Sequence, residues 1–130
     1  MPRTASPHPT EMELKILKIL WRIGPATVRE VREELAALSD PAYTTVMTLM
    51  GIMTKKGYLS RRKKGPGYVY RPRVTEESVK KTMLSDLVDR AFEGSTLSVM
   101  LNLIETEGIR SEELEELRKL IDKKRKEESK

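Results

Sequence analysis

The sequence predicts a mainly α-helical protein with one small β-hairpin near its middle. Helix-start signals precede apolar residues at helical spacing in several segments. Around Gly65-Pro66-Gly67, two short β-favouring runs flank a turn instead. The charge is also divided, since the chain through Val74 has 14 Lys or Arg against 6 Asp or Glu, and the chain from Thr75 on has 11 against 14. We therefore expect a basic N-terminal domain and a separate, mildly acidic helical domain.

The first domain that we expect spans residues 10–74 and follows a Pro-rich arm, residues 1–9, that we expect to be flexible. Thr10 and Thr27 each precede a Glu by three residues, which is the capping-box pattern of a helix start. Gly24-Pro25 ends the first helix. We expect one face of the second helix to be apolar, at Val28, Val31, Leu35 and Leu38.

A third helix is predicted from Pro41 to about Lys56, with Asp40 as its N-cap and Gly57 as its stop. The hairpin follows, from Leu59 to Arg73. Three short helices followed by a basic hairpin are the element order of a winged helix-turn-helix domain. In such domains the second helix of the pair enters the DNA major groove.

Double-stranded DNA is therefore the expected partner, and the region Asp40–Arg73 is expected to contact it. Threonine can hydrogen-bond bases or phosphates, and its methyl group can pack on thymine. Gly51 removes a side chain where a DNA backbone could approach. The candidate DNA-binding residues on the third helix are Tyr43, Thr44, Thr45, Met47, Thr48, Gly51 and Lys55. Candidates for phosphate contacts are Arg61, Arg62, Lys63, Lys64 and Tyr68 on the hairpin, with Thr27 and Arg29 at the start of the second helix.

The second domain that we expect spans residues 75–130 and ends in a frayed, charged tail. Helix starts at Thr75 and Ser111 bracket the largely apolar segment Leu97–Ile104. Three short helices with so many apolar residues are hard to bury within one small domain, so we expect a homodimer that reads a palindromic operator. The candidate dimerisation residues are Met83, Leu84, Leu87, Val88, Leu97, Met100, Leu101, Ile104, Leu117 and Leu120.

Enzyme chemistry is disfavoured by composition. The chain has no Cys, and its one His is His8 in the expected arm, so we predict no catalytic residue, no metal and no cofactor. No apolar run reaches the length of a membrane span, and the first residues lack a secretory signal, so a cytoplasmic protein with no membrane insertion is expected. The alternative is a winged-helix module for protein–protein interaction without operator DNA.

The sequence resembles the penicillinase repressor and methicillin-resistance repressor family over about Thr10 to Lys124. Several stretches carry the resemblance in combination: Glu11–Trp21, Ala26–Val31, Tyr43–Leu49 with Lys55–Leu59, Tyr70-Arg-Pro, Phe92–Ser95 and Glu112–Leu117. The resemblance implies a homodimeric winged-helix repressor with intertwined C-terminal helices. Its targets would be operators of β-lactamase or related genes.

The same resemblance implies a membrane-bound sensor protease as a further partner. In relatives this protease is linked to inactivation by a cut after an Asn that precedes Phe. Asn102 matches that Asn, whereas Leu103 replaces the Phe, so Asn102 and Leu103 are the candidate proteolytic site. The copper-responsive branch of the family ends in a Cys-rich metal site, and this chain has no Cys.

Overall fold

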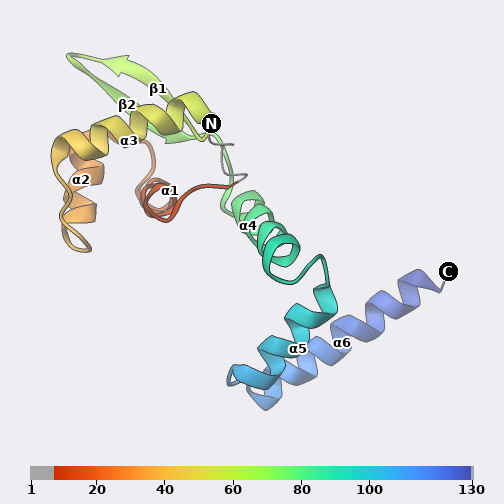
Figure 1. The fold of residues 1–130 in the computed structure, drawn as a ribbon. Coiled ribbons are helices and arrows are strands. Elements are labelled where there is room, and N and C mark those ends of the chain that lie inside the picture. The colour runs from red at the N-terminus through yellow and green to blue at the C-terminus, as the bar shows by residue number, and fades with distance from the viewer. Residues whose placement is uncertain (1–7, 130) are drawn as a thin grey trace. The chain divides into compact units, whose positions relative to one another are not determined.

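A computed structural model describes residues 8–129 of the chain. This range contains six helices and one two-stranded antiparallel sheet (Figure 1). The elements are α1 (Glu11–Ile23), α2 (Val28–Ala36), α3 (Tyr43–Lys56), β1 (Leu59–Lys64), β2 (Gly67–Pro72), α4 (Glu76–Ala91), α5 (Thr96–Thr106) and α6 (Ser111–Glu128). The predicted mainly helical fold with one small hairpin is confirmed.

The first two helices begin at the predicted capping boxes. The N–H of Glu13 donates to Thr10 Oγ1 at 3.3 Å, and the N–H of Thr10 donates back to Glu13 Oε1 at 2.8 Å. At α2, the N–H of Glu30 donates to Thr27 Oγ1 at 3.2 Å, and the N–H of Thr27 donates back to Glu30 Oε1 at 3.0 Å. Each box satisfies donors that have no partner inside the helix, which fixes where α1 and α2 start.

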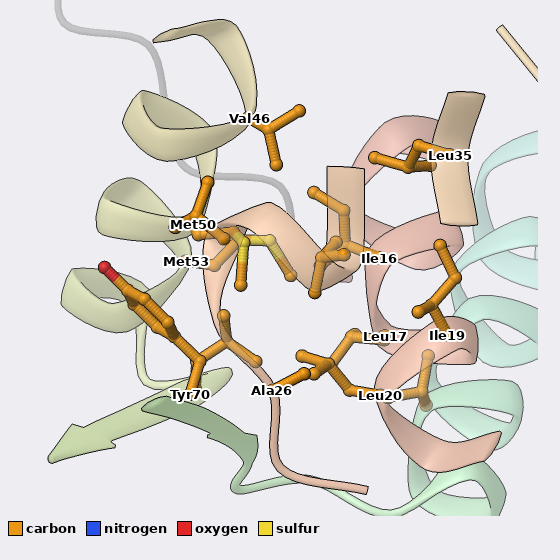
Figure 2. Close-up of a cluster of buried hydrophobic side chains, with 14 residues drawn as sticks. Ile16, Leu17, Ile19, Leu20, Ala26, Leu35, Val46, Met50, Met53 and Tyr70 are labelled. Atoms are coloured by element: carbon orange, nitrogen blue, oxygen red, sulfur yellow. The ribbon is translucent and has the colours of Figure 1, made fainter. Parts of the chain in front are cut away.

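One hydrophobic core joins α1, α2, α3 and the hairpin (Figure 2). Val46, Met50 and Met53 line the inner side of α3 and are each at most 1% exposed. They face side chains from α1 and α2, and Tyr70 of β2 closes the core from the hairpin. The buried residues of α1 and α2 in this cluster are Ile16, Leu17, Ile19, Leu20, Val28, Val31 and Leu35. This packing fixes which side of α3 is left facing outward.

The start of the third helix was predicted two residues too early. α3 begins at Tyr43, and its N-cap is Ala42, which makes no side-chain capping bond. Asp40 has a φ of 44°, and its Oδ1 lies 3.6 Å from an Arg32 guanidinium nitrogen. The Nε–H of Arg32 also donates to the carbonyl of Pro41 at 3.2 Å. The Asp40 carboxylate therefore pairs with Arg32 of α2 in the turn between α2 and α3, and it does not cap α3.

The second helix is also shorter than its apolar pattern predicted. It ends at Ala36, and the carbonyl of Leu35 accepts from the N–H groups of Leu38 and Ser39 at 2.8 and 2.9 Å. Leu38 lies in this turn and is 66% exposed. The expectation that Leu38 lines the inner face of α2 is therefore wrong, because the chain leaves the helix before that position.

From α4 onward the structure is helical with little burial. The N–H of Ser78 donates to Thr75 Oγ1 at 3.1 Å, which confirms the predicted start of α4. The charged tail was expected to fray, but α6 continues through its basic run to Glu128. Lys, Arg and Glu have good helix propensity, and the cations suit the negative end of the helix dipole.

The chain separates into two compact units, and the division lies inside α4. One unit ends at Leu87 and the other starts at Val88. The boundary predicted between residues 74 and 75 stays a prediction. The arm predicted over residues 1–9 lies outside the described residues except for His8 and Pro9. Pro9 is buried, and His8 Nε2 lies 3.0 Å from Asp86 Oδ2, so these two residues are packed within the first unit.

Candidate nucleic-acid interface

The outward side of α3 is polar and uncharged over most of its length. Since α3 has 3.6 residues per turn, burial of Val46, Met50 and Met53 places Thr44, Thr48 and Lys55 on the opposite side. Those three side chains are exposed. The helix therefore presents hydroxyl and methyl groups along this side and one ammonium group in its last turn.

Larger exposed side chains flank this side. Tyr43 and Met47 are each 46% exposed, and Ile52 is 42% exposed. Thr45 is exposed in the first turn, and Gly51 is half-buried in the middle of α3. All seven candidate residues predicted on this helix thus lie on α3 itself, and six of them are exposed. Whether they contact DNA stays a prediction.

A buried ion pair joins the C-terminal end of α3 to the start of α1. Lys56 Nζ lies 2.9 Å from Glu13 Oε2, and the Glu13 side chain is only 1% exposed. Lys56 also lies 6.0 Å above the centroid of the Tyr58 ring. Burial and the Glu13 carboxylate raise the pKa of Tyr58, against the opposing charge of Lys56. The sequence indicated only the capping role of Glu13, because its partner is 43 residues away.

The hairpin is a basic wing next to α3. Arg61, Arg62, Lys63 and Lys64 are all exposed, as predicted for phosphate contacts. In the register of the hairpin, Arg61 is opposite Tyr70 and Arg62 is opposite Val69. Cross-strand partners share a face and neighbours along a strand alternate, so cations project from both faces of the wing.

One face of the wing is anchored by tyrosines. Tyr70 is 2% exposed, and its backbone pairs with that of Ala26 at 2.8 and 3.0 Å. Tyr68 is 38% exposed, and the Arg61 guanidinium stacks 4.2 Å from its ring centroid. Arg61 also donates to the Tyr70 hydroxyl at 3.5 Å, and this hydrogen bond raises the pKa of Arg61. Of the two tyrosines, only Tyr68 leaves its ring accessible to a partner.

The opposite face of the wing has a small basic hollow that the sequence did not single out. The residues that line it are Pro25, Ser60, Arg61, Arg62, Val69 and Arg71. Arg71 Nε donates to Ser60 Oγ at 3.4 Å. The register pairs Ser60 with Arg71, next to the pair of Arg62 and Val69. Side chains alternate between the two faces along Gly67–Pro72, and the strand register shows which face is buried. With that register known, the sequence would have indicated Arg71 as a further exposed cation.

The start of α2 differs from the open anion site that we expected at Thr27 and Arg29. Arg29 is exposed, but the N–H of Thr27 donates to the Glu30 carboxylate. Hydrogen bonds from the backbone and then from the side chain of Thr27 lower the pKa of Glu30, and the charge of Lys64 contributes in the same direction. The Glu30 carboxylate therefore accepts the N–H of Thr27, and phosphate binding at Thr27 and Arg29 stays a prediction.

The candidate dimerisation residues are mostly exposed within one chain. Leu97 is 66% exposed, and Leu101 and Ile104 are 47% and 49% exposed. Half-buried members are Met83, Val88 and Leu117, and the other exposed members are Leu84, Leu87, Met100 and Leu120. Such a concentration of uncovered apolar side chains is unusual for a monomer.

The candidate proteolytic site lies inside helix α5. Asn102 and Leu103 are exposed, and Asn102 Nδ2 donates to the carbonyl of Ser98 at 2.9 Å. Cleavage there stays a prediction. Among residues 8–129, no group of three or more potential metal ligands was found, and no helix is long and apolar enough to cross a membrane.

The winged-helix elements and most of the C-terminal helices lie within the range of one known protein family. The model of the penicillinase repressor family matches residues 9–123. This chain belongs to the penicillinase repressor family. The resemblance predicted from the sequence is thereby confirmed, over almost the same range of residues.

Two relatives in this family align with most of the chain. The penicillinase repressor of Bacillus licheniformis is 29% identical over 116 residues, which are 89% of this chain and 91% of that protein. The methicillin resistance regulatory protein MecI of Staphylococcus aureus strain N315 is 29% identical over 112 residues, or 86% and 91% of the two chains.

A solved structure matches the N-terminal part. The solution structure of the DNA binding domain of the repressor BlaI superposes with a TM-score of 0.50 and 30% sequence identity. It covers 57% of this chain and 90% of that domain. The winged-helix assignment predicted for the N-terminal region is thus confirmed.

Proposed function

We propose that this family member is a homodimeric transcriptional repressor that binds a palindromic DNA operator. The observation that carries the proposal is the exposed side of α3, which is uncharged as far as Lys55 in the last turn, beside a wing with four consecutive exposed cations. A recognition helix supplies base contacts and a basic wing supplies phosphate contacts, which is the division of roles in helix-turn-helix proteins. The DNA-binding domain of the repressor BlaI, which shares this fold, supports the proposal.

The C-terminal unit supports the homodimer. Met100, Leu120 and Ile121 line an open groove in this unit together with Lys124 and Arg125. Burying a fully exposed leucine contributes about 1.5–3 kcal/mol. Leu97, Leu101 and Leu120 are 66%, 47% and 56% exposed, so covering each with a second copy contributes about half of that, and several together favour association. A two-fold dimer would present two α3 helices to two half-sites about one helical turn apart.

The relatives' names suggest the target genes. One relative is a penicillinase repressor and another is a methicillin resistance regulatory protein. We therefore include operators of β-lactamase-type or related genes in the proposal. Footprinting of genomic fragments bound by the protein would identify these operators.

The test of the proposed function is selection of duplexes from a random-sequence pool by the full-length protein. The expected product is an inverted repeat whose affinity falls steeply as salt is raised, because bound cations displace counterions from the DNA phosphates. Arg62→Ala is expected to weaken binding to all duplexes and to reduce the salt slope by about one, whereas Arg118→Ala on α6 should leave the slope unchanged. Absence of duplex binding at low salt would contradict the proposal and favour the protein–protein interaction module.

A further inference from the structure

We propose that α3 recognises its operator through the 5-methyl groups of thymine, so that A·T pairs occupy the positions under its first two turns. This inference rests on the proposed function, because it specifies which chemical group on the DNA the recognition helix reads. It names the methyl groups of Thr44, Thr48 and Met47 as the protein side of the contact.

The first argument is the absence of the side chains that read other bases. Guanine is read mainly by Arg or Lys, adenine by Asn or Gln, and cytosine by Asp or Glu. The segment Tyr43–Thr54 contains none of these residue types, and Lys55 in the last turn is the first charged residue of α3. In a helix-turn-helix the N-terminal residues of the helix contact the base edges. The part of α3 that reaches the bases therefore lacks a bidentate reader for any of the three.

The second argument is what α3 does offer. Thr44 and Thr48 are exposed on the outward side, and Met47 beside them is 46% exposed. A shallow groove along the helix is lined by Thr44, Thr45, Thr48, Leu49 and Ile52. Its surface consists mainly of methyl and methylene groups, which match the one apolar group in the major groove, the thymine methyl. Burying one methyl group corresponds to about a fourfold change in affinity.

The hydroxyl groups of the same threonines provide the competing explanation. A threonine that donates its hydroxyl to a phosphate would bind every sequence equally, whereas a threonine that packs on a thymine methyl would lose affinity when that methyl is removed. The two contacts can be separated chemically on both the DNA and the protein. Deoxyuridine lacks only the methyl of thymidine, Thr→Ser removes only the side-chain methyl, and Thr→Val keeps a methyl but removes the hydroxyl.

The experiment uses the full-length protein and a duplex selected from a random-sequence pool. Each thymidine is replaced by deoxyuridine, one position at a time, and affinity is measured by fluorescence anisotropy. We expect a loss of about fourfold at a few positions of each half-site and none elsewhere. With Thr48→Ser, the loss at one of these positions should disappear, while Thr48→Val should retain it. Met47→Ala should abolish the loss at a different position.

Several outcomes overturn the inference. If every deoxyuridine duplex binds like its thymidine counterpart while the selected sequence is still preferred over random DNA, methyl reading is wrong and the proposed function stands. If Thr48→Val removes specificity and Thr48→Ser does not, the hydroxyl is the reader. If selection enriches no sequence, the proposed function itself fails. Misfolding of a variant leaves the deoxyuridine series on the unmodified protein as the decisive measurement.

Discussion

At the scale of single residues, Gly51 is not explained by the protein's own packing. A Cβ atom placed on it would meet no atom within 4 Å, so nothing inside the chain requires its small size. Glycine in a helix interior costs about 1 kcal/mol relative to alanine. An external partner that approaches the helix closely would account for this residue.

Gly51→Ala is therefore expected to change stability and DNA binding in opposite directions. The free energy of unfolding should rise by about 0.5–1 kcal/mol in a urea titration, because alanine is the better helix former. Affinity for the selected duplex should fall several-fold, because the added methyl group meets the DNA. Gly108→Ala, between α5 and α6, is the control and should not alter affinity. A more stable Gly51→Ala protein with unchanged affinity would remove Gly51 from the interface.

The carboxylate of Glu30 makes the stability of the fold depend on pH. Its pKa is lowered from the ordinary value of 4.5, chiefly by the hydrogen bond from the backbone N–H of Thr27. The folded state then binds the proton more weakly than the unfolded state, so Glu30 stabilises the fold above pH 4.5. This contribution is lost as pH falls through the lowered pKa.

Glu30→Gln should accordingly lower the melting temperature at neutral pH, and the difference from the unmodified protein should shrink in acid. Thermal unfolding followed by circular dichroism at pH 7 and about pH 3 measures both values. Glu33→Gln on the same helix controls for the loss of a charge alone. A difference that is the same at both pH values would mean that the Glu30 carboxylate does not act through its charge.

At the scale of elements, the Glu13–Lys56 pair holds the C-terminal end of α3 against α1. Removing Lys56 leaves a carboxylate that is 1% exposed without its counter-ion. Breaking a buried pair in this way costs about 3–5 kcal/mol, and less where one partner is partly solvated, as Lys56 is at 30% exposure.

A double-mutant cycle tests this role. Lys56→Met and Glu13→Met should each destabilise the protein in urea titrations. The double variant should be less destabilised than the sum of the two, because it leaves no unpaired buried charge. The exposed pair of Arg22 and Glu34, at 2.7 Å between α1 and α2, is the matched control and should couple by less than about 1 kcal/mol. Equal coupling in both cycles would show that burial of Glu13 has no special effect.

Local signals explain which elements could be predicted from the sequence. The capping boxes at Thr10 and Thr27 lie within four residues and gave correct helix starts. The start of α3 was predicted wrongly because Asp40 was expected to cap it. In the structure the Asp40 carboxylate lies near the guanidinium of Arg32 on the preceding helix instead. The register of the wing and the partner of Glu13 depend on residues far apart in the chain. A local sequence pattern therefore could not predict either of them. Arg71 was not predicted as a site residue because its place on the wing depends on the register.

At the scale of the whole molecule, the exposed apolar side chains of the C-terminal unit are expected to be covered by a second copy. Leu101→Glu should shift the protein toward monomer in sedimentation at low concentration, because a carboxylate cannot be buried there unpaired. Leu101 is 47% exposed within the chain, so the variant should retain its helical content. Lys119→Gln on α6 is the control, because it lowers the net charge by one, as Leu101→Glu does, without removing an apolar side chain. A Leu101→Glu protein that remains dimeric would contradict this interface.

In the proposed complex, two copies of the α3 and wing region bind two half-sites on one face of the DNA. The most direct test inserts about five base pairs, half a helical turn, between the half-sites of the selected operator. We predict that affinity then falls to that of a single half-site, because one half-site has rotated to the opposite face. Unchanged affinity for the lengthened operator would contradict this arrangement.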